Sequence, residues 1–267
     1  MSHFSVMVKC RVDDLEDVPG IVSEMLEPYD EGLRVDAYVD KDASEVQAEF
    51  DRIKDEVDNW PAGKDVPSYL QKYMNGAIHQ LTVEDWAKNW YGQSMDADGN
   101  LLTEYNPDSK WDWYEIGGRW FGYITLKEGR VGIKTKPSWG WSKEDIDKVK
   151  DRFDIAYIKD IDFDTILERQ KEDAASFWDK TMAEGKGYYY NTIKDTSRDD
   201  YIAKAATGLT AFAVVDDMGW HEPAKMGWFG CLHSENEDEN VWDERFMERF
   251  LTDYTDDTAI AIVDCHI

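Results

Sequence analysis

Hydrophobic and polar residues alternate with the period of a β-strand in several short segments of the chain. The alternation is strict in residues 33–39, which are therefore expected to form a half-buried strand. Residues 259–263 are continuously apolar, which is typical of a short buried strand. Strands are predicted at residues 3–8, 33–39, 155–158, 209–215 and 259–263, with a meander through 131–133.

Longer segments between these strands repeat their apolar residues every three or four positions, which predicts amphipathic helices. Thr82 and Asp85 have the spacing of a capping box at the start of one helix. Asp98-Gly99 is typical of a hairpin turn. Helices are expected at residues 14–26, 44–57, 67–74, 82–91, 164–182, 199–206 and 241–254, with another beginning at Ser142 and an aromatic cluster, Tyr188 to Tyr190, before the helix at 199.

This order of elements predicts an α+β fold with an antiparallel or mixed sheet and with helices packed mainly on one side. The sequence shows no internal repeat and no composition shift that would mark a linker. Residues 1–267 are therefore expected to form a single domain, in which a helical insertion could occupy residues about 42–92.

The most unusual segment runs from residue 106 to residue 126. Asn106-Pro107 forces an extended or turning start, because proline disfavours the α conformation in the residue before it. The pair Gly117-Gly118 permits a bend or a bulge. Arg119 follows between Gly118 and Trp120, where a guanidinium could stack on an aromatic ring. The segment is either the centre of the core or a recognition surface.

Charge separates this chain from proteins that bind nucleic acid or anionic membranes. Its 57 acidic and 30 basic residues give a net charge of −27, which repels polyanions and favours basic partners. Residues 127–152 are the one basic island, with 8 basic and 5 acidic side chains, and are the better place for a phosphate-bearing ligand. Three widely spaced cysteines, no signal-peptide pattern and no membrane-length apolar run predict a reduced, cytoplasmic protein.

Several segments resemble one group of sequences. They are the opening Met-Ser-His-Phe-Ser-Val, the turn at 27–31, the block from Asn106-Pro107 to Trp120, the stretch from Lys225 to Gly230 and the ending Val-Asp-Cys-His-Ile. Together they are similar to a group of uncharacterised accessory proteins of phages and prophages. The resemblance implies a viral or mobile-element setting, where small acidic proteins often act on host factors or host defences, and it implies no activity.

Catalytic and metal-binding signatures are weak. The first and last strands could be neighbours, which would bring His3 near His266, and Cys231 with His233 and Asp264 with Cys265 add further candidate ligands. No pair has the repeated spacing of a zinc site. No Gly-x-Ser-x-Gly or phosphate loop occurs, and 57 acidic residues make accidental carboxylate pairs certain. We therefore expect no cofactor and assign no catalytic residue.

Aromatic residues near an arginine make the better case for a small-molecule site. Stacked aromatic rings with an arginine are how proteins hold bases and nucleotides. The alternative is that these tryptophans face the sheet inward as core, since large aromatic side chains are mostly buried for packing. The candidate ligand-binding residues are Trp111, Trp113, Tyr114, Arg119, Trp120 and Trp228.

A structure can distinguish a structural role of Arg119 from a ligand-binding role. A structural arginine should pair with a buried carboxylate such as Asp112 or Glu115, whereas a ligand-binding arginine should not.

Three functions follow from the sequence. The first is a phage-type acidic accessory protein that binds a basic surface of a host protein without catalysis, in counter-defence for example; the host protein could be one that handles DNA. The second is a pocket protein that binds or sequesters a nucleotide-like ligand. The third is a metal-dependent hydrolase. None of them involves direct nucleic-acid or membrane binding.

Overall fold

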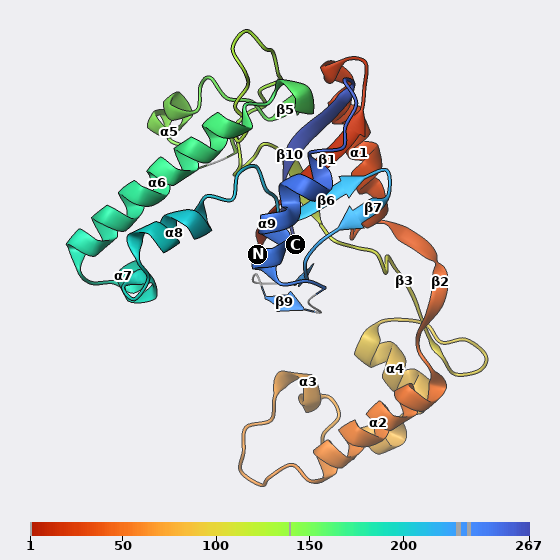
Figure 1. Cartoon of the computed structure of the whole chain (residues 1–267). Helices are drawn as coiled ribbons and strands as arrows, with labels where there is room; N and C mark the ends of the chain where they lie inside the picture. Colours follow the sequence, from red (N-terminus) through yellow and green to blue (C-terminus); the bar gives the residue numbers. More distant parts are fainter. Residues whose placement is uncertain (1, 139, 228–230, 234–235) are drawn as a thin grey trace. The chain divides into compact units, whose positions relative to one another are not determined.

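The computed structural model describes residues 2–138, 140–227, 231–233 and 236–267, and the chain divides into two compact units (Figure 1). The main unit comprises Met1–Glu31 and Asp108–Ile267, and the inserted unit comprises Gly32–Pro107. Each unit has its own hydrophobic core. The helical insertion expected at about 42–92 lies within the inserted unit, which also contains two strands.

A mixed six-stranded sheet forms the centre of the main unit, which confirms the predicted α+β fold. Its order is β4-β10-β1-β6-β7, and β5 pairs with β10 beside β4. The pair of β1 and β6 is parallel, and the other pairs are antiparallel. The strands are β1 (His3–Arg11), β4 (Trp113–Ile116), β5 (Ile155–Tyr157), β6 (Ala213–Asp216), β7 (Gly219–His221) and β10 (Thr258–His266), and a separate small sheet joins β8 (Lys225–Met226) to β9 (Leu232–His233).

The first and last strands are neighbours, as the sequence predicted. β1 and β10 pair over nine residues each, from His3 opposite His266 to Arg11 opposite Thr258. Two backbone hydrogen bonds between Ser2 and Ile267 continue the ladder past the strands. Residues at opposite ends of the sequence therefore lie side by side at one end of the sheet (Figure 1).

The two faces of the main sheet are covered by different helices. Val6 and Val8 of β1 belong to the first core, together with apolar residues of α1 (Val18–Leu26). Met7 belongs to the second core, together with residues of α6 (Phe163–Glu184) and α9 (Glu239–Phe250). Because α7 (Tyr188–Ile193) and α8 (Arg198–Ala205) pack against α6, most of these helices lie on the second-core side.

The remaining helices follow local sequence signals. Ser142 and Ser197 accept hydrogen bonds from the backbone N–H groups three residues further on, which starts α5 and α8. Tyr188 to Tyr190, expected to precede a helix, are themselves the first turn of one. None of the described helices is long and apolar enough to cross a membrane. The helices of the main unit not yet given are α5 (Lys143–Lys148) and the 3₁₀ turns Leu15–Asp17, Glu27–Tyr29 and Ile158–Asp160.

The meander expected through residues 131–133 is not a strand. Only Ile133 takes part, in an isolated bridge to Ile155. The bridge lies on the edge of β5 opposite β10, since Ile155 pairs with Ala261 of β10 on its other edge.

The inserted unit is a cluster of helices with a two-stranded antiparallel sheet. Asp42 and Glu45 form a reciprocal capping box, and Thr82 caps α4 through the backbone N–H of Asp85 as predicted. The predicted turn at Asp98-Gly99 is confirmed, with Asp96 accepting from the N–H groups of Asp98 and Asn100. The elements are β2 (Arg34–Lys41), α2 (Ala43–Asp58), α3 (Ser68–Gln71), the 3₁₀ turn Ala77–Gln80, α4 (Val83–Tyr91) and β3 (Leu101–Tyr105).

Gly117 and Gly118 form a bend that only glycine fits. Their φ angles are +80° and +52°, in the left-handed region. A β-carbon at 117 would lie 2.5 Å from Oγ1 of Thr135, and one at 118 would lie 2.5 Å from Cβ of Asp264. The bend therefore lets the chain after β4 pass directly over the side chain of Asp264.

We predict that Gly118→Ala destabilises the main unit by roughly 2–6 kcal/mol, because a left-handed alanine is strained and its methyl group overlaps Asp264. Gly129→Ala is the matched control, since Gly129 has φ +74° but open space around it. It should cost only about 1–2 kcal/mol. Urea unfolding followed by tryptophan fluorescence measures both, and equal losses would show that contact with Asp264 is unimportant.

Candidate functional site: two anchored histidines at the end of the main sheet

Two histidines meet where β1 begins and β10 ends, and the side chain of each lies against a carboxylate. Nδ1 of His3 lies 2.7 Å from Oδ1 of Asp264, and Nδ1 of His266 lies 2.6 Å from Oδ1 of Asp112. The two rings are 4.8 Å apart between centroids, with one edge toward the other. We call these four residues the histidine cluster. Because each Nδ1 faces a carboxylate, it is the protonated nitrogen, and Nε2 is left to exchange protons or bind a ligand.

Asp264 organises this cluster from inside the protein. Its side chain is fully buried, whereas His3 is 18% exposed. Its second oxygen, Oδ2, accepts a hydrogen bond of 3.0 Å from the backbone N–H of Arg119. Both oxygens therefore have donors, which a buried carboxylate requires. The same contact fixes the position of residue 119 beside the histidines.

Glu115 adds a second carboxylate next to this buried charge. It is opposite Asp264 in the pairing of β4 with β10. Burial, and then the negative charge of Asp264, raise the pKa of Glu115 above its usual value. The environment thus disfavours the charged form of Glu115.

Trp113 and Arg119, two of the predicted site residues, lie at the histidine cluster. The ring of Trp113 is 46% exposed and stands with its edge toward His3, 6.2 Å away between centroids. The side chain of Arg119 is exposed. In the part of the chain that the structure describes it has no ion pair, and Asp112 is paired with His266 instead.

The other predicted residues lie elsewhere. Trp111 is 7% exposed and donates from Nε1 to the backbone oxygen of Leu26, and Tyr114 packs edge-on against it in the first core. Trp120 packs against the second core. Trp228 lies outside the described residues. Trp113 and Tyr114 are separated because successive residues of a strand point to opposite faces.

Sequence reasoning did not single out the carboxylates of Asp112 and Asp264 as partners of the histidines. His3 and Asp264 are 261 positions apart, so only the strand pairing brings them together. The available signal was that His3 begins the first predicted strand and His266 follows the last predicted strand by three residues. Among the described residues, no group of three or more His, Cys, Asp or Glu side chains could hold a metal ion.

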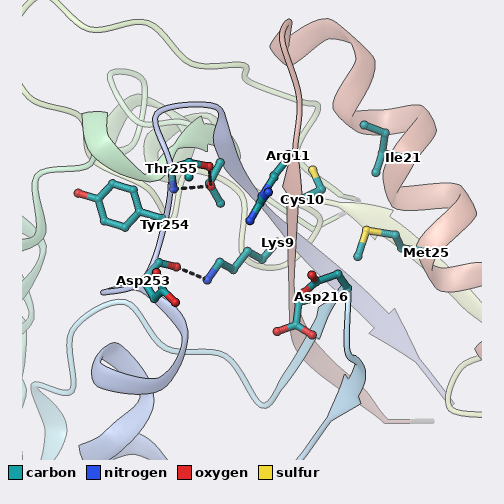
Figure 2. A pocket seen from close by; sticks show the side chains of 11 residues that line it. Lys9, Cys10, Arg11, Ile21, Met25, Asp216, Asp253, Tyr254 and Thr255 are labelled. Atoms are coloured by element: carbon teal, nitrogen blue, oxygen red, sulfur yellow. Dashed lines mark hydrogen bonds between the residues drawn. The ribbon is translucent and has the colours of Figure 1, made fainter.

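A second feature is a cavity of about 590 Å³ beside the free edge of β1, where β6 ends. Figure 2 shows Lys9 and Arg11 on one side of β1, with Ile21 and Met25 of α1 on the other. Nζ of Lys9 donates to the backbone oxygen of Asp253, 2.8 Å away. Burial raises the pKa of Cys10 in the cavity wall to about 11, so this thiol is a neutral apolar surface at physiological pH.

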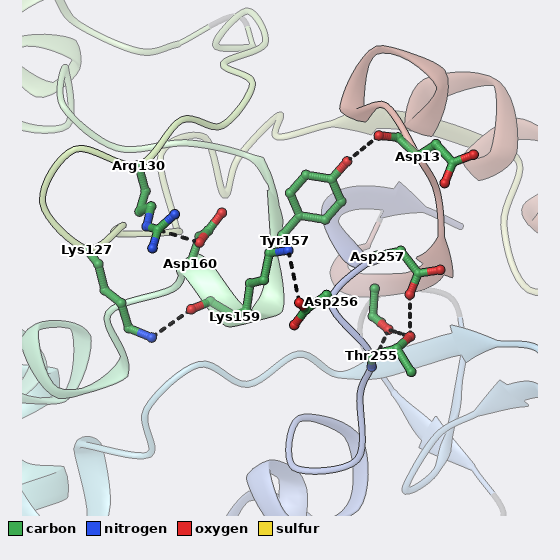
Figure 3. Close-up of polar contacts among 10 residues, drawn as sticks. Asp13, Lys127, Arg130, Tyr157, Lys159, Asp160, Thr255, Asp256 and Asp257 are labelled. Carbon is green, nitrogen blue, oxygen red and sulfur yellow. Dashed lines mark hydrogen bonds and ion pairs between the residues drawn. The ribbon is translucent and has the colours of Figure 1, made fainter.

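The loop on one rim of this cavity is held by several polar contacts (Figure 3). The backbone N–H of Thr255 donates to Oγ1 of Thr258, and the backbone N–H of Val12 donates to the oxygen of Asp257. Asp256 lies 3.9 Å from Nζ of Lys159. These contacts tie the loop to β1, β10 and the segment that carries Lys159.

Replacing Glu115 tests the electrostatics of the site. Because its folded pKa is raised, the charged form costs stability, and this cost grows as pH rises through the folded pKa. Glu115→Gln should therefore raise the melting temperature at pH 7–8, and the gain should vanish below about pH 4, where the glutamate is also neutral when unfolded. Glu128→Gln, at an exposed position, is the control. A gain that persists at low pH would assign the effect to packing.

Comparison with known proteins assigns no family to this chain. No protein-family model matches it, and no curated protein or solved structure is significantly similar to it. The function is therefore inferred from the geometry of the side chains.

Proposed function

We propose that the end of the main sheet binds a small nucleotide-like molecule at the histidine cluster. The observation that carries this proposal is the meeting of two anchored imidazoles with an exposed tryptophan, Trp113, at the carboxylate that also holds the backbone of Arg119, an exposed arginine with no ion pair within the described residues. An exposed aromatic ring and an exposed guanidinium without a counter-ion are both available to a ligand.

Each group has a role that suits such a ligand. The face of Trp113 can stack on a base, since every base has a π-face. The guanidinium of Arg119 can form a bidentate pair with phosphate oxygens. The Nε2 atoms of His3 and His266 can each give or take one hydrogen bond. The ligand that fits these groups carries an aromatic ring and an anionic group.

The acidic surface supports a second function, the binding of a basic surface on a host protein in the host cytoplasm. Helix α2 buries Val46, Phe50 and Ile53 in the core of the inserted unit. Its opposite face exposes Asp51 and Asp55. This acidic face is independent of the histidine cluster, so the two functions can be tested separately.

Variants of Arg119 and Trp113 test the first proposal. Arg119→Ala should change stability by less than about 1 kcal/mol, because no buried carboxylate in the described part of the chain loses its partner. It should weaken binding of mononucleotides at least about tenfold, the loss expected for one charge-assisted contact. Arg119→Lys should restore only part of the affinity, and Trp113→Leu should weaken it independently of the phosphate.

Calorimetric titration with AMP, UMP and their nucleosides measures these effects, and thermal melts measure stability. Trp111→Phe is the matched control, since Trp111 lies in the first core and should affect stability without affecting affinity. No saturable binding by the wild type, or a large loss of stability in both Arg119 variants, would contradict the proposal.

The acidic face of α2 generates a separate prediction. A partner captured from host lysate should associate quickly at low salt and more slowly as ionic strength rises. Asp51→Lys with Asp55→Lys should cut the on-rate with little change in melting temperature. Asp164→Lys with Glu168→Lys, at exposed positions of α6, is the control. Competition by duplex DNA would identify the partner surface as one that binds DNA, and an on-rate equal to that of the wild type would exclude α2.

A further inference from the structure

The basic island at residues 127–152 contains cations that have partners, exposed lysines that have none among the described residues, and Arg152. Lys127 donates to the backbone oxygen of Lys159, and Arg130 lies 3.3 Å from Asp160 (Figure 3). Lys148 pairs with two acidic side chains of its own helix. Arg152 is half-buried, and within the described residues no carboxylate lies in ion-pair range of its guanidinium. A partly desolvated cation without a counter-ion is costly.

Strand geometry places Arg152 next to Thr125. Ile124 and Phe153 form an antiparallel bridge and exchange two backbone hydrogen bonds of 2.9 Å. Thr125 and Arg152 are the residues that flank this bridge on the same side, so their backbones lie close together. The backbone of Thr125 is fixed from its other side, since its oxygen accepts from the N–H of Asp162 at 2.9 Å.

A second half-buried arginine reaches the same threonine. Nη1 of Arg169, on α6, donates to Oγ1 of Thr125 at 2.8 Å. Arg169 also has no carboxylate in ion-pair range among the described residues. Burial lowers the pKa of both arginines, and the charge of Arg169 lowers that of Arg152 further. Asp173 is the carboxylate that opposes these effects, and it is exposed.

We propose that Arg152, Arg169 and Thr125 form a binding site for a phosphate group. Two guanidinium groups offer paired N–H donors that match the oxygens of a phosphate, and the bound dianion would neutralise both cations. The hydroxyl of Thr125, which now accepts from Arg169, can donate to a phosphate oxygen. The ligand class is inorganic phosphate or a phosphomonoester. The site shares no residue with the histidine cluster, so either proposal can fail without the other.

Titration with inorganic phosphate at low ionic strength tests the site, with sodium chloride added to matched ionic strength as a reference. The wild-type protein should show a saturable rise in melting temperature and saturable heat in calorimetry. Arg152→Gln and Arg169→Gln should each weaken phosphate binding at least about tenfold, the loss expected for one charge-assisted contact. Arg152→Lys should give an intermediate affinity, because lysine lacks the planar fork. Lys136→Gln removes the same charge from an exposed position of the basic island and should bind like the wild type.

The melting temperature of each variant in phosphate-free buffer tests the proposal even if a variant folds poorly. Because the two arginines repel each other, Arg152→Gln should melt at the wild-type temperature or above it in phosphate-free buffer. A clear loss of stability would show that Arg152 has a structural partner and would overturn the proposal. A response to phosphate that matches sodium chloride, or one that is equal in Arg152→Gln, would overturn it as well.

Discussion

The fully buried carboxylate of Asp264 is the contact on which this end of the protein depends. A buried charge is tolerated only when donors surround it, and here His3 of the first strand and the backbone N–H of Arg119 supply them. The chain can reach Asp264 only because Gly118 has no side chain. Asp154 is a second buried carboxylate of this kind. It accepts hydrogen bonds from the backbone N–H groups of Gly122 and Thr135. Two aspartates and two glycines thus join the start, the middle and the end of the sequence.

Local signals predicted much of the fold but little of the site. The caps at Thr82 and Ser142 and the turn at Asp98-Gly99 are encoded within four residues, so sequence alone located them. The sequence also raised the pairing of the first and last strands that brings His3 opposite His266. The carboxylate partners of these histidines were not predicted, since 57 acidic residues give no means to choose Asp112 and Asp264. That choice is made by strand register, which is non-local.

Tryptophan content proved ambiguous for a physical reason. Trp111 and Trp113 are two residues apart, yet Trp111 is buried against Leu26 while Trp113 is half exposed beside His3. The alternation of a strand cannot explain this difference, because residues two apart on a strand share a face. The explanation is that β4 begins only at Trp113, so Trp111 lies before the strand, in an isolated bridge to Asp30. The residue at which β4 begins therefore determines that Trp111 is buried and Trp113 is exposed.

The net charge of −27 has opposite effects on the two kinds of proposed partner. It repels a small anion and attracts a basic protein surface. At physiological salt a ligand responds mainly to charges within about 8 Å, so an anion can bind beside Arg119 or Arg152 even though the distant field repels it. Raising the ionic strength weakens that distant repulsion as well as the local attraction, and half-buried arginines are screened less than exposed acidic residues. The approach of a small anion should thus be slowed little or even helped by salt. The approach of a basic protein to α2 can only be slowed. Strong slowing of association by salt therefore indicates the protein-binding function, and weak slowing or acceleration indicates the small-molecule one.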